Sequence, residues 1–380
     1  MSSIHRHPHV GRWLAAVTLG LSACAGRAGE ASTTGAGASG VIDRMTADRP
    51  ALGVDTVEVW ICDVPAGSTA ELYGALTYRL PLTSGDVVGR IEAPIATYFS
   101  TVSDGRYELR FAAGGTVAMA DDGTDQDCVD EALDRSSPQA DVVLAVATAE
   151  HAERQPGGWG RPGSWLTCEG RCPASLTRRA ASVGASDFHP DWGSVPLLDL
   201  IEHELGHTLG LPHSASPVPG SNTYPSALDL MSNSAAPRDV HPERRDAPPP
   251  LAIDRLDVGW LPADAVVVVP PEGQDLELSA SASPTGVRLA ILPIDDARVV
   301  TVEYLRPTAL LDHLPEAGVA VHVVSDAAGG DVLRVQDTQG SEPPHTDLLT
   351  AGEELTVQGW RIEILAAGST VRVAVAPTDR

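Results

Sequence analysis

The run LIEHELGHTLGLPHS, residues 200–214, places three histidines and a glutamate close together in a chain that has twelve histidines in all. Its apolar residues recur at helical spacing, so we expect a helix here. On a helix, His203 and His207 lie on one face, one turn apart, with Glu204 beside them. Gly210 can adopt the left-handed conformation that ends a helix, so the chain can turn back and bring His213 to the same point. Three imidazoles around an open fourth position are typical of a catalytic zinc site.

The alternative interpretation is a helix with incidental surface histidines. It requires the spacing HExxHxxGxxH to arise by accident. From the composition of the chain, a chance match to this pattern is expected on the order of 10⁻⁴ times or less per chain. We therefore favour the metal site.

The eleven-residue pattern from His203 to His213 is the zinc signature of the metzincin metallopeptidases, which this sequence resembles. Metzincins also carry a methionine in a tight turn beneath the metal, and SALDLMSNSA supplies Met231, eighteen residues after His213. The resemblance implies that His203, His207 and His213 bind one catalytic zinc ion and that Glu204 is the general base. It also implies that Met231 lies under the site, although an ordinary core methionine is the alternative for that residue.

The resemblance further implies a zinc-dependent endopeptidase. Zinc lowers the pKa of a bound water, and Glu204 takes a proton from that water during attack on a peptide carbonyl and returns it to the leaving amine. Some metzincins have a tyrosine two residues after the methionine that helps to hold the oxyanion. Here that position is Asn233, and the nearest tyrosine, Tyr224, can equally pack against the turn. The alternative function is a catalytically idle lipoprotein of this fold that binds a partner or glycan through its C-terminal domain.

The N-terminus predicts export. Residues 1–23 have the form of a signal peptide, since arginines precede the apolar run WLAAVTLGL, which is too short for a mature membrane span. The run ends in LSAC, which resembles the bacterial lipobox. Cys24 is then the lipidated first residue of the mature protein, held at the cell envelope on the outer face of a membrane. Simple secretion is the alternative, and residues 24–50, rich in Gly, Ala, Ser and Thr, are expected to be a flexible tether.

Charge and cysteine content agree with an extracellular protein. The formal net charge of −25 argues against nucleic acid as a partner. We expect a monomer whose partners are protein or peptide substrates and, through the lipid on Cys24, a membrane. The other four cysteines suit an oxidising exterior. Of three possible pairings we favour Cys168–Cys172, which closes a short loop, together with Cys62–Cys128; a second zinc held by thiols is the rival interpretation.

The chain predicts an α+β fold with two domains. In residues 51–261, strand patterns alternate with helix patterns before the zinc helix, as in the mixed-sheet catalytic domain of a metzincin. Residues 262–380 contain short runs of β-branched residues separated by Gly, Pro and Asp, which predict an antiparallel β-sandwich. The acidic segment 121–127 could bind calcium, but it lacks the spacing of a calcium-binding helix-loop-helix, so a solvated turn is favoured.

The C-terminal half narrows the resemblance. The segments DVGWLP, VVTVEYLRP, LPEAGVAVHVVSD and LLTAGEELTVQGWRIEIL are similar to the tail of immune-inhibitor-A-like and gametolysin-like secreted metallopeptidases. The likeness runs from about residue 54 to residue 375. Outside the zinc signature it consists of short, degenerate motifs.

Overall fold

The structure is a computed structural model. It describes residues 50–68, 79–149, 157–163, 178–214, 226–295, 298–308, 310–326, 333–337 and 348–378. The signal peptide, the tether with Cys24, the pair Cys168 and Cys172, and Tyr224 lie outside the described residues, so what we expect of them stays a prediction. Helices and several sheets are present, which confirms the α+β class. None of the helices in these ranges combines the length and apolar character needed to cross a bilayer.

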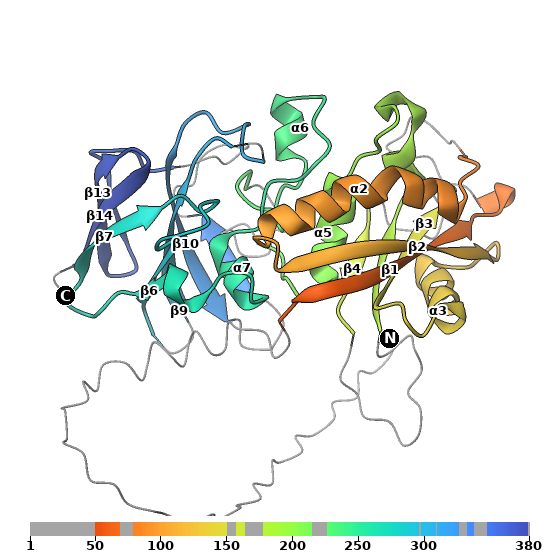
Figure 1. The fold of residues 1–380 in the computed structure, drawn as a ribbon, viewed down its shortest axis with the longest axis horizontal. Coiled ribbons are helices and arrows are strands. Elements are labelled where there is room, and N and C mark those ends of the chain that lie inside the picture. The colour runs from red at the N-terminus through yellow and green to blue at the C-terminus, as the bar shows by residue number, and fades with distance from the viewer. Residues whose placement is uncertain are drawn as a thin grey trace, which may run out of the picture. The chain divides into compact units, whose positions relative to one another are not determined.

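The first half of the chain holds a five-stranded sheet with the order β2-β1-β3-β5-β4 (Figure 1). Four of its strands run parallel, whereas β4, at one edge, is antiparallel to its neighbour β5. These strands are β1 (Gly53–Asp63), β2 (Tyr107–Ala118), β3 (Val142–Ala147), β4 (Trp159–Arg161) and β5 (Arg179–Val183). A parallel sheet needs cover on both faces, and helices supply it here.

Successive residues of β1 are buried on opposite faces of this sheet, because side chains alternate along a strand. Val57, Val59 and Ile61 pack in one cluster with α2 and α5. Trp60 and Cys62 pack with α3 in another. The helices are α2 (Ser84–Val102), α3 (Asp125–Arg135), α5 (Asp199–Thr208), α6 (Ala236–Val240) and α7 (Ala252–Asp257), with 3₁₀ turns η1 (Ala66–Ser68), η2 (Ala185–Phe188), η3 (Pro190–Trp192) and η4 (Ala263–Ala265).

The acidic segment 121–127 forms a turn that leads into α3. Thr124 caps this helix by accepting the Asp127 N–H, and the Asp127 carboxylate accepts the Thr124 N–H at 2.8 Å, so the two residues form a capping box. Among the described residues, no side chain of this segment belongs to a cluster that could hold a metal ion. Its role in the described structure is therefore to start a helix.

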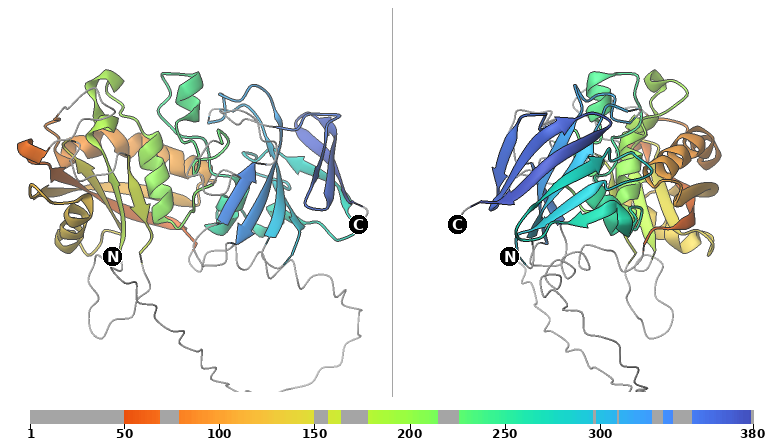
Figure 2. Two further views of the ribbon diagram at one scale, coloured as in Figure 1. Left: turned by 180° about the vertical axis from the view of Figure 1, so that it is seen from behind. Right: turned by 60° about the vertical axis from the view of Figure 1, so that its left-hand side comes forward.

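The second half of the chain forms two further sheets (Figure 2), with the orders β11-β10-β9-β8-β6 and β12-β13-β14-β7. One hydrophobic cluster takes buried residues from both, including Leu278, Val300 and Ile362. The strands are β6 (Val266–Val268), β7 (Gln274–Ser279), β8 (Leu289–Pro293), β9 (Arg298–Leu305), β10 (Gly318–Asp326), β11 (Leu333–Asp337), β12 (Glu354–Val357), β13 (Trp360–Ala367) and β14 (Thr370–Pro377). The four-stranded sheet is antiparallel, as expected, but β6 and β8 pair in parallel, which the pattern of short strands does not predict.

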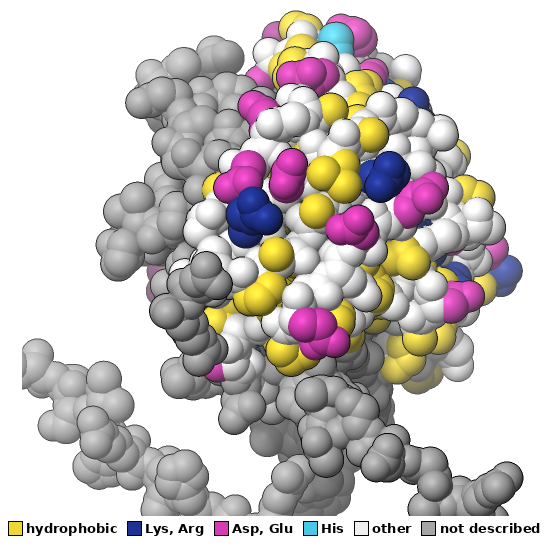
Figure 3. Space-filling model, turned by 90° about the vertical axis from the view of Figure 1, so that its left-hand side faces the viewer, with side chains coloured by type: hydrophobic (Ala, Val, Ile, Leu, Met, Phe, Trp, Pro, Cys, Tyr) yellow, Lys and Arg dark blue, Asp and Glu magenta, His cyan; other side chains and the backbone are white. Residues whose placement is uncertain are grey.

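The four-stranded sheet has one buried face and one solvated face. Leu276 and Ile362 point into the cluster, whereas Glu277, Arg361 and Arg372 are exposed. In the space-filling view from this side of the molecule, charged side chains of both signs are interspersed with small apolar patches (Figure 3). The alternation of buried and exposed residues along these strands is typical of an antiparallel sheet with one face in water.

The predicted pairing of Cys62 with Cys128 is confirmed. The bond joins the end of β1 to the first half of α3, with 6.0 Å between the Cα atoms and 66 residues of sequence separation. It therefore closes a large loop across the face of the sheet that lies opposite α5.

We expect the double substitution Cys62→Ala and Cys128→Ala to lower the free energy of unfolding by about 4 kcal/mol, because the disulfide removes the loop-closure entropy of a long unfolded loop. Urea unfolding of the variant and the unsubstituted protein measures this difference. An unchanged midpoint and slope would show that the bond contributes nothing to stability.

Candidate metal centre

The helix α5 carries His203, Glu204 and His207 and ends in a Schellman motif. Gly210 has a φ of 94°. Its N–H donates to the His207 carbonyl at 3.0 Å, and the next N–H, of Leu211, donates to the Gly206 carbonyl at 3.3 Å. This pair of bonds satisfies carbonyls left open by the helix end and reverses the chain. The turn at Gly210 is as predicted, and it returns the backbone toward the helix.

Backbone carbonyls orient two of the histidines. His203 Nδ1 lies 2.8 Å from the Leu230 oxygen, and His207 Nδ1 lies 2.8 Å from the Leu211 oxygen. A carbonyl oxygen can only accept a hydrogen bond, so Nδ1 carries the proton in both neutral rings. Each Nε2 therefore keeps a lone pair.

The Nε2 atoms of three histidines converge at one point. His213 Nε2 lies 3.1 Å from His203 Nε2 and 2.9 Å from His207 Nε2. Because the Nε2 atoms of His203 and His207 carry no proton, His213 has at most one hydrogen to share between two short contacts. A tetrahedral ion with metal–nitrogen distances of about 2.0–2.1 Å would hold nitrogens roughly 3.3 Å apart, near the observed spacing. The donor set thus fits a metal ion.

Burial keeps these imidazoles neutral. It lowers the pKa of His203 to about 3 and that of His213 to about 4, with a smaller contribution from the neighbouring His207. Burial also lowers the pKa of His207 itself. A histidine must be unprotonated to bind a metal, so all three rings are in the binding form at neutral pH.

Two glutamates flank His203 and have different surroundings. Glu202 is fully buried and accepts the Ala247 N–H at 2.8 Å, and burial raises its pKa well above the usual value. The side chain of Glu204 lies instead against the chain just before β4: a Cβ built on Gly158 would be 2.8 Å from its Oε1 atom. Glu202 is therefore bonded into the core, whereas Glu204, which is also buried, follows His203 directly in the sequence of the helix.

The approach of β4 to α5 depends on glycine. A Cβ on Gly160 would lie 2.0 Å from the Glu204 carbonyl oxygen and 2.8 Å from the His207 Cβ. A Cβ on Gly158 would lie 2.7 Å from the Glu204 Cγ. The helix pattern of residues 200–214 does not reveal these two glycines, although the cluster GGWG at residues 157–160 is a signal for close backbone approach.

Met231 is fully buried and packs directly against α5. A Cβ on Gly206 would lie only 2.8 Å from the Met231 sulfur, and the Met231 carbonyl accepts the Ser214 N–H at 2.9 Å. The residue before it, Leu230, supplies the carbonyl that orients His203. Met231 thus lies in a segment that contacts both the helix and the chain next to His213.

Two more residues of this segment have defined contacts. Asn233, two residues after Met231, donates its N–H to the Ser226 carbonyl at 3.0 Å and closes the loop. Asp229, which the sequence analysis missed, is fully buried; its carboxylate accepts the Ser214 hydroxyl and, at 3.3 Å, the Leu251 N–H. The carboxylate links the residue after His213 to the start of α7.

Comparisons with known proteins add little. No protein-family model matches the chain, and no curated protein matches it. Among solved structures it is similar to metalloproteinase-II from Bacteroides fragilis, with 14% sequence identity and a TM-score of 0.25. The match covers 57% of this chain and 59% of that protein, less than two thirds of its length. The metal centre is therefore inferred from the geometry of its own residues.

We expect Gly160→Ala to lower the free energy of unfolding by about 1–3 kcal/mol and to weaken metal binding, because the added methyl group overlaps the backbone of α5. Gly89→Ala is the matched control. That glycine lies inside α2 with nothing within 4 Å of an added Cβ, so alanine there should stabilise the helix by up to about 1 kcal/mol. Thermal unfolding and metal titration of both variants test this, and equal stability in the two would contradict the close packing of β4 on α5.

Proposed function

We propose that this chain is a zinc endopeptidase of the metzincin type, related to the immune-inhibitor-A-like and gametolysin-like secreted peptidases. The observation that carries the proposal is the convergence of three Nε2 atoms within a single HExxHxxGxxH run that also supplies Glu204. The three neutral imidazoles, one buried and two half-buried, support a borderline-soft divalent ion such as zinc rather than calcium or magnesium, which prefer oxygen ligands.

His203, His207 and His213 would hold the zinc. The metal supplies Lewis-acid chemistry, since it lowers the pKa of a water molecule and polarises a carbonyl oxygen. Three protein ligands leave a position open, which is the arrangement of catalytic rather than structural zinc sites. The bonds from Nδ1 of His203 and His207 to backbone carbonyls fix both rings, so the chain holds its ligands in place before the metal arrives.

Glu204 is the general base in this proposal. It lies on the same turn of α5 as the two histidine ligands and is only 4% exposed, so its carboxylate is held at the site. It accepts a proton from the attacking water and then donates that proton to the amine that leaves the cleaved peptide. Glu202 cannot share the role, because its carboxyl group is bonded to Ala247 in the core.

The edge of the first sheet supports a peptide as the substrate. β4 is the terminal strand of the sheet among the described residues, and it lies against α5 at Gly160, as does Gly158 just before it. An extended peptide can add to the open edge of such a strand through main-chain hydrogen bonds, which would not depend on the side chains of the substrate. A peptide on this edge would run past Glu204 and the three histidines.

The peptidase domain spans residues 51–261 and the C-terminal β-sandwich spans residues 262–380. Cys24 carries the lipid that holds the protein at the outer face of a membrane, and residues 24–50 tether the domains to it. The Cys62–Cys128 disulfide supports an oxidising location outside the cytoplasm.

We expect Glu204→Gln to keep zinc and to lower kcat by a factor of about 10² to 10⁴, because it removes the proton acceptor and keeps the shape of the side chain. Glu202→Gln is the matched control on the same helix: its amide oxygen can still accept the Ala247 N–H, so turnover should stay within about twofold of the unsubstituted protein. Cleavage of a quenched fluorescent protein substrate at confirmed zinc occupancy measures both.

Two outcomes would overturn the proposal. Full activity of Glu204→Gln would place the base elsewhere. Zinc binding without cleavage of any unstructured protein by the unsubstituted chain would favour the idle, partner-binding lipoprotein.

For the location, we expect Cys24→Ala to release the protein from the membrane fraction in soluble form, because it removes the site of lipid attachment. Fractionation of producing cells and phase separation in detergent measure this. A variant that still sediments with membranes would refute the lipid anchor.

A further inference from the structure

The loop from Ser226 to Asn233 sets the orientation of His203. Its ends are closed, because Asn233 donates to the Ser226 carbonyl at 3.0 Å and Ser226 donates to the Ser232 hydroxyl at 3.0 Å. Within it, the Leu230 carbonyl accepts the Nδ1 proton of His203. A shift of this loop would therefore rotate or release a metal-binding ring.

Two separate hydrophobic clusters hold this loop. Leu230 and Met231 belong to the cluster beneath the first sheet, together with α2 and α5. Leu228, two residues earlier, belongs instead to a cluster built from α7 and strands of the C-terminal half, including Ile291 and Val299. The C-terminal sheets thus share in fixing the backbone that orients His203.

A polar contact from the C-terminal half reaches the same loop. His313, in the connection between β9 and β10, is 5% exposed and places Nε2 2.7 Å from the Ala227 carbonyl. Burial lowers its pKa, so the ring is neutral near pH 7 and Nε2 carries the single proton that it donates. On either side of His313, Leu311 and Leu314 are buried in the same cluster as Leu228. The connection is therefore held firmly against the loop.

We propose that His313 is a positioning residue through which the C-terminal β-sheets hold the loop 226–233, and with it His203, in the geometry that binds metal. This inference rests on the proposed zinc site. It assigns the C-terminal half a part in the metal centre, so that half is not simply an appended binding module. Partners that orient a metal ligand from outside typically change metal affinity by 10- to 100-fold when they are removed.

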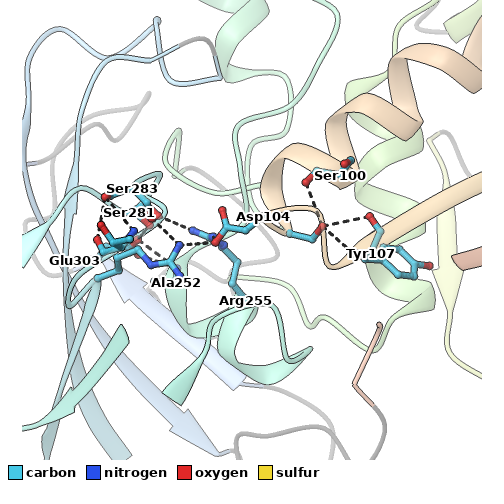
Figure 4. Close-up of polar contacts among 11 residues, drawn as sticks. Ser100, Asp104, Tyr107, Ala252, Arg255, Ser281, Ser283 and Glu303 are labelled. Carbon is cyan, nitrogen blue, oxygen red and sulfur yellow. Dashed lines mark hydrogen bonds and ion pairs between the residues drawn. The ribbon is translucent and has the colours of Figure 1, made fainter. Parts of the chain in front are cut away.

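The same half of the chain makes a second polar contact that provides a control. Arg288, before β8, bonds to the Asp104 carboxylate in the turn between α2 and β2. Arg255 of α7, in the first half, bonds to the same carboxylate (Figure 4). Nearby, Glu303 of β9 accepts the Ala252 N–H at the start of α7 (Figure 4). A substitution at Asp104 therefore weakens packing of the C-terminal half without removing a contact to the loop.

The test compares zinc affinity, by competition with a chromophoric chelator, in the full chain and its variants. We expect His313→Ala to weaken zinc binding about tenfold. We expect His313→Gln, whose amide can donate to the Ala227 carbonyl, to recover most of that loss. Asp104→Asn should lower the unfolding temperature and leave zinc affinity within about twofold. If His313→Ala does not fold, His313→Leu, which fills the space and has no donor, takes its place.

Each result decides the inference. Unchanged affinity in His313→Ala or His313→Leu, while the unsubstituted chain binds zinc, would overturn the role of His313 and leave the proposed function intact. Equal losses in the His313 and Asp104 variants would show general destabilisation and would also overturn it. If the unsubstituted chain binds no zinc, the proposed function fails and this inference fails with it.

Discussion

The candidate site depends on two hydrogen bonds from imidazole to backbone carbonyl. The bonds of His203 to Leu230 and of His207 to Leu211 place the proton of each ring on Nδ1, and so direct two Nε2 lone pairs toward His213. Burial keeps the rings neutral, since a charged imidazole is costly in an apolar environment. These three close nitrogens share at most one proton, whereas a positive ion among them would satisfy all three lone pairs, and this is the physical reason for inferring a metal.

One of these carbonyls is held by the local helix end, and the other is held by distant parts of the chain. The Leu211 carbonyl follows the Schellman motif at Gly210, which is a local feature of the helix end. The Leu230 carbonyl lies in a loop fixed between two hydrophobic clusters, one beneath the first sheet and one shared with the C-terminal sheets. The helix α5, the loop 226–233 and the C-terminal half thus together fix the orientation of the His203 ring.

Local sequence predicted the parts of this site that lie close together in the chain. The helix over residues 199–208, the turn at Gly210 and the return of His213 all follow from spacing and from the conformational freedom of glycine. The sequence did not predict the contact of β4 with α5, the link from Asp229 to Ser214, or the contact of His313 with Ala227, which is 86 residues away. Such contacts depend on how the sheets and loops pack, and neither periodicity nor turn chemistry encodes that. The parallel pairing of β6 with β8 was not predicted for the same reason.

The most direct test of the central claim is zinc K-edge X-ray absorption on the purified chain, with the metal content measured on the same sample. We predict one zinc per chain, with three imidazole nitrogens at about 2.0–2.1 Å and one further light-atom ligand. Absence of zinc, or sulfur scattering at about 2.3 Å, would contradict a centre built from His203, His207 and His213.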